Sequence, residues 1–397
     1  MLIVHKYGGS SVATITQIMA IAQHIKTLKE KGSDLVIVAS AMGKTTNELV
    51  AMAYEISTNP SLRELDMLLA TGEIQTVTLL SIALNNIGVK AIALSGAQAG
   101  ILTTENFSRA FIKSIDKKQI KKLIKEGYTV IVAGFQGITE SGDTTTLGRG
   151  GSDTTAVALA SVLKCPCEIY TDVEGVFTTD PKLYKNAKKL TKISYDEMLE
   201  MAINAAKVLE TRSVELAKIY HTKVYLAKAL EKEKKGTIIT PRKRFFEEMK
   251  ISGLATKDNV CVLTFQTPIN YEHQDALLNV LSENCQNFEM FNLIQTQNSN
   301  FLSLSCPEIF MNVESVIKSN ELFSKVKVTA KRNLVRVTLV GTGLATHKFF
   351  IKKTSEILNK NKIKTYHILL SETSITFTIN YNNKQKAVEV LVAEFGL

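Results

Sequence analysis

The segment TLGRGGSDTTA, residues 146–156, combines three glycines, one arginine and one aspartate with four hydroxyl side chains. Glycine lets a backbone approach a ligand closely, while an arginine and an aspartate supply a fixed cation and a fixed anion. The pattern predicts a loop in which Arg149 and Asp153 hold the charged groups of an anionic ligand. A mobile surface turn is the alternative for this segment taken alone.

Three further loops carry similar chemistry: KYGGSS at 6–11, SAMGKTTN at 40–47 and TDVEGVFTTDPK at 171–182. In the first, adjacent glycines after a strand let backbone N–H groups close on phosphate, and the following helix offers its positive N-terminus. Lys6 then lies near transferring phosphoryl oxygens. The spacing of KYGGSS matches neither GxxxxGK[ST] nor GxGxxG, and a structural turn fits this loop equally well in isolation. A turn and hairpin is likewise the alternative for TDVEGVFTTDPK taken alone.

The elements before these loops are short β-branched runs, which predict buried strands over 2–7, 35–40, 89–95, 129–135 and 167–173. Amphipathic stretches between them, such as 13–32 and 152–164, predict helices. Strands alternating with helices indicate an α/β fold, a mostly parallel central sheet with helices on both faces. Ligands in such sheets bind beyond the carboxyl ends of the strands, so the glycine loops are expected on one rim.

The character changes near 228–256, where a charged segment punctuated by Pro and Gly predicts a domain boundary. Beyond it, the order strand, helix, two strands, helix occurs twice, around 260–319 and 334–395. We expect two βαββαβ modules rather than a solenoid. The predicted domains are 1–240, a linker at 241–256, and modules at 257–325 and 326–397. The strand near Ile251–Leu254 is expected to join the second module, with the first inserted inside it.

Bulk composition excludes several classes of protein. The 397 residues are 45% hydrophobic and 22% charged, and no apolar run approaches the length of a membrane span. Although the net charge is +10, the lysines are dispersed and the basic runs contain glutamates, so we expect no nucleic-acid and no membrane partner. Such a surface would attract small anionic substrates. Five cysteines without an export signal predict a cytoplasmic protein.

Metal ligation by side chains is not predicted. Cys165 and Cys167 have one residue between them, which is poor spacing for zinc, and we expect core thiols. The six histidines form no HExxH pattern.

In sequence order, the motifs resemble those of the aspartate kinase (aspartokinase) family within the amino-acid kinase superfamily. KYGGSSVA is similar to the family's KFGGTSVA, and SAMGKTTNEL to its SAMGKTTDEL. ATGE at 70–73, GRGGSD and TDVEGVFTTDP match further motifs, and 193–217 resembles the segment that closes the kinase domain. The resemblance spans the whole chain and implies an amino-acid kinase fold followed by two ACT modules.

By motif position, the resemblance implies Lys6 as the catalytic cation together with Asp153, and a phosphate loop of Gly8, Gly9 and Ser10. The aspartate substrate would be held by Ser40, Thr46, Glu73, Arg149 and Asp153, with Glu73 at its amino group and with Arg149 and Asp153 at its charged backbone end. ATP would be contacted by Thr171, Asp172, Phe177, Asp180, Lys182 and Lys207. Mg²⁺ is expected as a companion of the nucleotide, with no metal site in the protein.

The implied reaction forms 4-phospho-L-aspartate, the first step toward lysine, threonine and methionine. Because the acceptor is already a carboxylate, catalysis needs positioning and charge neutralisation rather than a general base. Arg149 suits a planar α-carboxylate through two parallel N–H···O bonds.

Three departures from the family pattern leave an alternative open. Lys182 replaces an arginine, the familiar GAKVLHP reads AAKVLET at 205–211, and LAKAL stands at 226–230. A specialised or catalytically weak paralogue that senses amino acids through its ACT modules is therefore the second hypothesis. A superfamily member that phosphorylates glutamate or a nucleotide is the third.

The ACT modules imply an amino-acid feedback effector and a homodimer, or a dimer of dimers, formed through these modules. LIQTQNSN at 293–300 resembles the effector-side strand, so Gln295 and Asn298 are candidate effector contacts. Plain turn-forming residues are the alternative there.

Overall fold

The computed structural model describes residues 1–204, 208–231, 235–241, 250–267, 275–276, 278–280, 290–295, 300–307, 323, 327–345 and 348–397. Contacts divide the chain into two compact units. The first comprises Met1–Thr178 and Lys188–Phe246, and the second comprises Thr179–Ala187 and Glu247–Leu397. Each unit is described by itself below.

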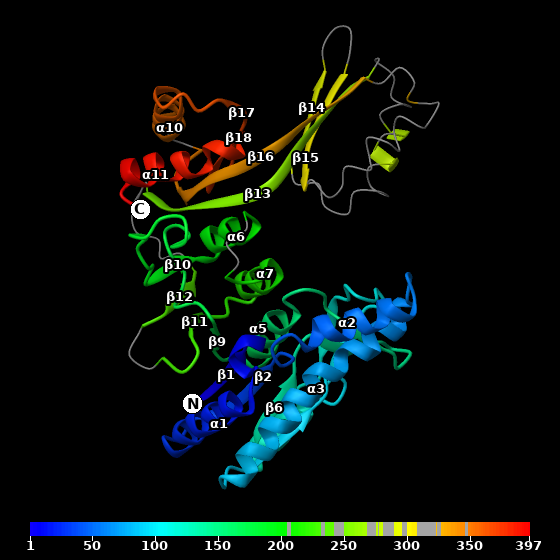
Figure 1. Ribbon diagram of the computed structural model, residues 1–397. Coiled ribbons are helices and arrows are strands. Elements are labelled where there is room, and N and C mark those ends of the chain that lie inside the picture. The colour runs from blue at the N-terminus through cyan, green and yellow to red at the C-terminus, as the bar shows by residue number, and fades with distance from the viewer. Residues whose placement is uncertain are drawn as a thin grey trace. The chain divides into compact units, whose positions relative to one another are not determined.

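An eight-stranded sheet forms the centre of the first unit, in the order β10-β12-β11-β9-β1-β2-β6-β3 (Figure 1). All neighbouring strands in it run parallel except β11 and β12. The mostly parallel sheet expected from the β-branched runs is therefore confirmed. The strands are β1 (Leu2–Tyr7), β2 (Asp34–Ala39), β3 (Ala91–Leu94), β6 (Thr129–Ala133), β9 (Cys167–Thr171), β10 (Lys192–Ser194), β11 (Val224–Lys228) and β12 (Thr237–Thr240).

Helices cover this sheet because alternate strand residues point to opposite faces. One apolar core joins odd-numbered residues of β1, β2 and β6 to α1 and α3, while α5 packs against β1, β2 and β9. The helices of the unit are α1 (Ile15–Glu30), α2 (Thr45–Ile56), α3 (Leu62–Asn86), α4 (Lys118–Lys125), α5 (Gly151–Leu163), α6 (Tyr195–Ile203) and α7 (Thr211–Ile219). A 3₁₀ helix, η1 (Gly9–Val12), precedes α1.

Helix α3 is long and apolar enough, by length and composition, to cross a membrane. Half of its most apolar window is buried, and Val77, Leu80 and Leu84 belong to the core between α1, α3 and the sheet. Burial of this kind is typical of the core helix of a globular domain.

A second, four-stranded sheet in the order β5-β4-β7-β8 lies beside α3 and was not predicted from the sequence. Its strands are β4 (Ile101–Thr103), β5 (Ile112–Ile115), β7 (Gln136–Ile138) and β8 (Thr144–Thr146). Strands of three or four residues are too short to show a period of two, and glycines surround them, so the sequence favoured loops at these positions.

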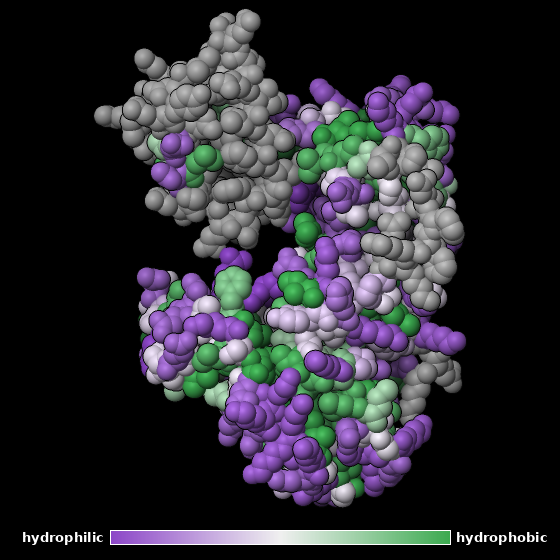
Figure 2. Space-filling view, turned by 180° about the vertical axis from the view of Figure 1, so that it is seen from behind, coloured by the Kyte–Doolittle hydropathy of each residue, from purple (hydrophilic) through white to green (hydrophobic). Residues whose placement is uncertain are grey.

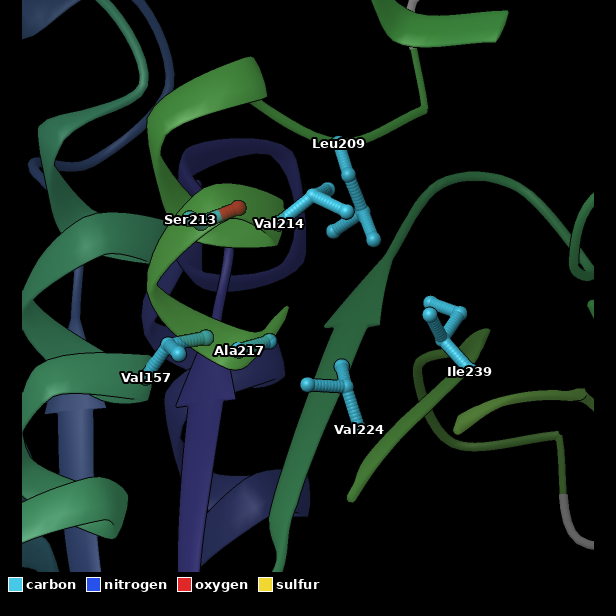
Figure 3. A pocket seen from close by; sticks show the side chains of 7 residues that line it. All are labelled: Val157, Leu209, Ser213, Val214, Ala217, Val224 and Ile239. Atoms are coloured by element: carbon cyan, nitrogen blue, oxygen red, sulfur yellow. The ribbon is translucent and has the colours of Figure 1, made fainter. Parts of the chain in front are cut away.

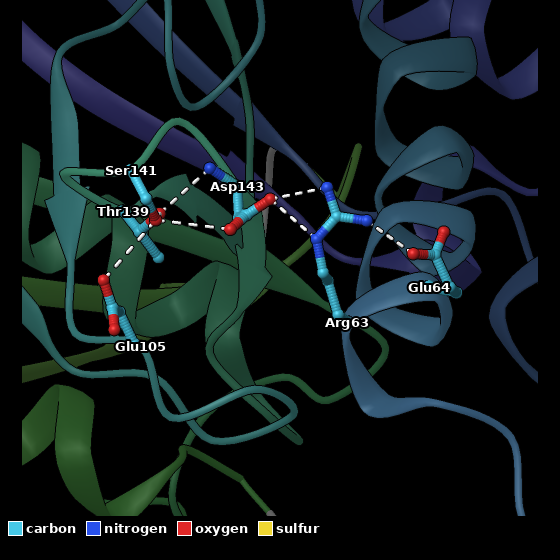
Figure 4. Close-up of polar contacts among 6 residues, drawn as sticks. All are labelled: Arg63, Glu64, Glu105, Thr139, Ser141 and Asp143. Carbon is cyan, nitrogen blue, oxygen red and sulfur yellow. Dashed lines mark hydrogen bonds and ion pairs between the residues drawn. The ribbon is translucent and has the colours of Figure 1, made fainter.

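Polar contacts connect the β7–β8 turn to the start of α3 (Figure 4). Arg63 lies 2.6 Å from Asp143 Oδ1, and the Asp143 N–H donates to Thr139 Oγ1 at 2.9 Å. The Ser141 hydroxyl contacts the same Asp143 carboxylate and reaches Glu105. Because Arg63 is half exposed, we expect this ion pair to contribute little stability and mainly to orient the turn.

The second unit contains a six-stranded antiparallel sheet in the order β14-β15-β13-β16-β18-β17. Strand β13 pairs with β16 along both halves, and only its second half, from Val260 to Thr267, also pairs with β15. The sheet thus has two parts that share β13 and β16. Its strands are β13 (Lys250–Thr267), β14 (Met290–Gln295), β15 (Asn300–Pro307), β16 (Lys327–Thr342), β17 (Thr365–Leu370) and β18 (Ser374–Asn380).

Two described helices, α10 (Lys348–Lys360) and α11 (Lys384–Phe395), and the 3₁₀ turn η4 (Tyr381–Asn383) complete the part of the second unit that contains β17 and β18. Their apolar side chains form one core with β13, β16 and β18. In the first repeat, the sequence pattern places the two helices at 273–284 and 309–319. Only 275–276 and 278–280 of the first are described, and the second lies outside the described residues. The segment Thr179–Ala187 belongs to this unit through Leu183, which packs on the core and whose carbonyl accepts a hydrogen bond from Gln385 at 3.0 Å.

Hydrophilic side chains cover much of the described surface on the face shown in Figure 2, with apolar side chains gathered between them. The exposed apolar residues include Met67, Ile74 and Ile82 along the outer face of α3.

Candidate active site

Lys6 lies near the carboxyl end of β1, between Val38 of β2 and Ile169 of β9. Its neighbour Tyr7 points into the core that contains α1, so the alternation of the strand directs Lys6 toward α5. There the Nζ atom lies 2.6 Å from Asp153 Oδ1, with the two side chains 10% and 12% exposed. The pair links residues far apart in the sequence in a nearly water-free position.

Asp153 occupies the first turn of α5, where a carboxylate is stabilised by the positive end of the helix dipole. The chain enters this helix through Gly148 and Gly150, whose φ angles of +80° and +70° favour glycine. Arg149 is exposed between them. The glycine-rich segment therefore turns sharply and then presents one end of a helix, and it ends in regular structure instead of forming a loop throughout.

The first two glycine loops touch one another. A Cβ atom on Gly9 would lie 2.7 Å from the Ala41 carbonyl oxygen, so this contact requires glycine. The Gly43 N–H donates to the Gly9 carbonyl at 3.0 Å, and the Ser40 N–H donates to the Tyr7 carbonyl at 3.1 Å. A Cβ on Gly8 would lie 3.4 Å from Lys6 Nζ, which places the phosphate-loop backbone beside the lysine.

Glu73 lies on α3 beneath the second glycine loop and is 3% exposed. Its Oε1 atom accepts the Ala41 N–H at 3.1 Å, while Oε2 is buried without a hydrogen-bond partner among the described residues. Burial raises the pKa of Glu73 to about 7, against the opposing effect of backbone hydrogen bonds such as that from Ala41. A buried, unpartnered carboxylate oxygen is suited to receiving a cationic ligand group.

The residues predicted for aspartate and phosphate thus meet through a chain of contacts. Lys6 touches Asp153 directly, and Glu73 is connected through Ala41 to the loop of Gly9. The remaining predicted members are part of the same segments: Ser10 is the second residue of the 3₁₀ helix, Thr46 lies in the first turn of α2 and Arg149 precedes α5. Asp153 was also predicted to touch the substrate, and that role stays a prediction because one of its oxygens is paired with Lys6.

The residues predicted for ATP are distributed over both units. Thr171 ends β9, its hydroxyl donates to Asp172 at 3.0 Å, and Phe177 forms a β-bridge with Lys189. Asp180 and Lys182 belong to the segment that groups with the second unit, where Asp180 Oδ1 accepts the Lys182 N–H at 2.8 Å. Lys207 lies outside the described residues.

Two buried or half-buried residues that sequence reasoning missed support the glycine segment of α5. Asp66 is fully buried on α3 and accepts hydrogen bonds from the N–H and hydroxyl of Thr146 at 2.7 Å each, and from the Ser108 N–H at 2.8 Å. Arg212 donates to the carbonyls of Leu147 at 2.6 Å and Ala110 at 3.0 Å. For Asp66, the available signal was a carboxylate at the start of the apolar stretch of α3.

A small pocket between α5, α7, β11 and β12 is not a ligand site (Figure 3). Its lining is apolar apart from Ser213, whose hydroxyl donates to the Glu210 carbonyl at 2.6 Å. The apolar side chains around this small cavity pack α7 against α5. The lining residues are Val157, Leu209, Ser213, Val214, Ala217, Val224 and Ile239.

Within the residues that the structure describes, no group of three or more His, Cys, Asp and Glu side chains could hold a metal ion. Within the described part of the chain, Cys165, Cys167 and Cys261 form no disulfide bond. Burial raises the pKa of Cys165 to about 11 and that of Cys167 well above its ordinary value, as for packed core thiols.

For the effector candidates, Gln295 ends β14, with its backbone paired to Asn300. Asn298 lies outside the described residues. Both assignments stay predictions.

Comparison with known proteins defines the class first: residues 1–228 match the family model of the Amino acid kinase family. Aspartokinase from Bacillus sp. (strain MGA3) is 41% identical, over 100% of this chain and 97% of that protein. Aspartokinase 2 from Bacillus subtilis (strain 168) is 39% identical, over 100% of this chain and 98% of that protein. The crystal structure of E. coli aspartokinase III in complex with aspartate and ADP matches with a TM-score of 0.83, 23% identity and full coverage of both chains, which shows a shared fold. This chain belongs to the amino acid kinase family and, within it, to the aspartokinases.

Proposed function

We propose that this aspartokinase transfers the γ-phosphoryl group of ATP to the side-chain carboxylate of L-aspartate, forming 4-phospho-L-aspartate. The observation that carries the proposal is the buried pair of Lys6 and Asp153, 2.6 Å apart at the carboxyl end of β1, in a chain related over its full length to aspartokinases. A cation fixed beside glycine backbone at this rim is what phosphoryl transfer between two anions requires.

Lys6 would stabilise the negative charge that spreads over the transferring phosphoryl oxygens, together with backbone N–H groups of Gly8 and Gly9. Asp153 holds the ammonium group in place before the phosphate arrives, so no reorganisation is needed during the reaction. The attacking atom is an oxygen of the substrate's own carboxylate. No protein base therefore has to remove a proton.

The acceptor would be oriented by charges at both ends. Glu73, with its unpartnered buried oxygen, is assigned to the α-ammonium group, and Arg149 to the α-carboxylate. Ser40 lies on the loop that contacts the phosphate loop, and Thr46 lies in the first turn of the helix that follows this loop. Both would hold the side-chain end of the substrate.

For the nucleotide, we assign Thr171, Asp172, Phe177, Asp180, Lys182 and Lys207 as ATP contacts. Mg²⁺ would enter as its ATP complex, with phosphate oxygens as ligands, and would neutralise phosphate charge when bound. The Asp153 carboxylate is paired with Lys6, which fits an ion carried by the nucleotide rather than by a protein cage.

We further propose cytoplasmic localisation, assembly as a homodimer or dimer of dimers through the second unit, and feedback by an amino-acid effector near Gln295 and Asn298. The shared β13 and β16 strands support coupling inside this unit, because one strand pair runs through both parts of its sheet. The product would feed lysine, threonine and methionine synthesis.

The test is an ADP-release assay on the purified chain with ATP, Mg²⁺ and L-aspartate, glutamate or a nucleoside monophosphate as acceptor, with Lys6→Met as the inactive control. Aspartate-dependent turnover that disappears in Lys6→Met supports the proposal. Turnover only with another acceptor contradicts it. No turnover with any acceptor, together with thermal stabilisation by a single amino acid, would favour the alternative of an amino-acid sensor.

A further inference from the structure

Glu210 lies directly over Gly150, the N-cap residue of α5. A Cβ atom added to Gly150 would be 2.6 Å from Glu210 Cβ and 2.8 Å from its Oε2 atom. The glutamate carboxylate therefore occupies the positive end of α5, three residues before Asp153. This is the region to which the proposed function assigns the α-carboxylate of the substrate.

This position is not explained by a structural role in α7. Glu210 is the N-cap residue of α7, yet its side chain makes no capping hydrogen bond. Its main chain is fixed by the Ser213 hydroxyl and by the packing of Leu209 in the apolar contact between α5 and α7 (Figure 3). The backbone is thus anchored on one side, while the half-buried side chain turns to the glycine segment.

The positive charges of three arginines act on the Glu210 carboxylate. Burial and the charge of Asp153 raise the pKa of Glu210, whereas Arg212, Arg149 and Arg109 act in the opposite direction. Arg212 is engaged by two backbone carbonyls, and Arg109 lies against the segment with its Cγ atom 3.7 Å from the Cβ position of Gly148.

Arg109 and Arg149 differ from Arg212 in being exposed. The Arg109 backbone N–H donates to the Asn106 carbonyl at 3.1 Å, whereas neither guanidinium group forms a hydrogen bond or ion pair among the described residues. Their guanidinium donors remain available to a carboxylate that enters from solvent. Glu210 also closes no ion pair within the described part of the chain, so it acts on them through its field rather than by a fixed contact.

We propose that Glu210 is a specificity-determining residue of the acceptor site, a built-in carboxylate that opposes the substrate α-carboxylate at the arginines and at the α5 N-terminus. Arg109 is proposed as a second guanidinium of that site beside Arg149. The inference rests on the proposed function. Glu210 lowers the affinity for every acceptor carboxylate, and it disfavours dicarboxylates without an amino group most, because they bring no cation to offset its charge.

The first experiment compares Glu210→Gln with wild type and with Glu215→Gln, which removes one charge from an exposed position of the same helix. We expect the KM for aspartate to fall about 3- to 10-fold in Glu210→Gln, with kcat and the KM for ATP within about twofold, and no change in Glu215→Gln. Arg109→Gln should raise the KM for aspartate by about the same factor. A KM for aspartate unchanged or raised in Glu210→Gln overturns the inference.

The second experiment does not depend on turnover. Succinate, a dicarboxylate without an amino group, is titrated calorimetrically into the same proteins in the presence of ADP. In Glu210→Gln the Kd for succinate should fall about 10-fold or more, which is a larger factor than the change in the KM for aspartate. In Glu215→Gln the Kd for succinate should not fall. Equal succinate affinity in all three proteins overturns the inference. Succinate affinity could increase in Glu210→Gln as expected while the wild-type protein never phosphorylates aspartate. That result would refute the proposed function and not the role of Glu210.

Discussion

The ammonium group of Lys6 lies 2.6 Å from Asp153 Oδ1, and both side chains are about nine-tenths buried. An unpaired charge in this buried position would cost free energy, so each of the two charged groups is stabilised there by the other. The pair therefore has two separable properties: it stabilises the junction of β1 and α5, and it presents one cation to the phosphate loop.

Substituting either partner alone should harm both properties. We expect Lys6→Met to lower kcat by ~10³-fold or more and the free energy of unfolding by about 3–5 kcal/mol, because Asp153 is left charged and unpaired. The stability cost comes from the burial of Asp153, in addition to the loss of turnover. Steady-state kinetics and urea denaturation measure the two effects.

The double variant Lys6→Met, Asp153→Asn separates them. It should recover most of the lost stability, since no buried charge remains, yet stay inactive. Lys118→Met, at a position 91% exposed, is the control and should change the unfolding free energy by no more than about 0.5 kcal/mol. A double variant as unstable as Lys6→Met would show that the two side chains are not coupled.

Glu73 predicts a pH dependence. Its pKa is raised to about 7 in the folded protein, above an ordinary value of 4.5, so the native state holds a proton that the unfolded state loses earlier. Between pH 4.5 and about 7 the folded protein should lose about 3 kcal/mol of stability as pH rises, with no further loss above. Glu73→Gln should abolish this component of the pH profile in thermal or urea unfolding.

Substrate binding gives the opposite trend for the same group. An α-ammonium group at Glu73 favours the charged carboxylate, so the KM for aspartate should fall as pH rises from 6 to 8. In Glu73→Gln the KM should be raised ~10-fold or more at pH 8 and should lose this dependence. A KM that varies with pH alike in both proteins would place the amino group elsewhere.

The sequence predicted the parts of the fold in which one local pattern decides the structure. The β-branched runs around Lys6 and Ile131 became buried central strands, and the repeated order after residue 250 became one antiparallel sheet. The small sheet beside α3 was missed because strands such as Gln136–Ile138 are too short to show a period. The pairing of this strand with β4, in which Ile138 lies beside Leu102, also joins segments distant in sequence, and local reasoning does not contain that partner.

The sequence predicted which residues belong to the candidate site but not the contacts that connect them. The resemblance of the motifs identified Lys6, Glu73 and Arg149 as candidate site residues. The structure adds that Glu73 is connected to the phosphate loop through the Ala41 N–H. It also adds Asp66, which meets Thr146 from 80 positions away. A residue whose importance lies in orienting another chain segment has no signature of its own, whereas a residue in a glycine motif does.

Asp66 should be a positioning residue for the segment before α5. Asp66→Ala leaves the backbone N–H groups of Ser108 and Thr146 without their acceptor, and we expect a loss of about 2–4 kcal/mol in the free energy of unfolding. The KM for aspartate should rise as well, since the glycine segment loses its anchor. Glu64→Ala, on an exposed site of the same helix, should cost less than about 0.5 kcal/mol. Equal losses in both variants would contradict the role of Asp66.

Gly150 tests the contact on which the role of Glu210 depends. Gly150→Ala combines an unfavourable positive φ with a collision against Glu210, whereas Gly142→Ala has a similar φ of +91° and no atom within 4 Å of its Cβ position. Gly142→Ala should cost about 1 kcal/mol of stability from the backbone alone, and Gly150→Ala at least about 1 kcal/mol more. Adding Glu210→Ala should recover part of that excess, because its Cγ and Oε2 atoms are removed, and should leave the cost of Gly142→Ala unchanged. Strictly additive effects of Gly150→Ala and Glu210→Ala in urea unfolding would show that the glutamate does not lie over the start of α5 in solution.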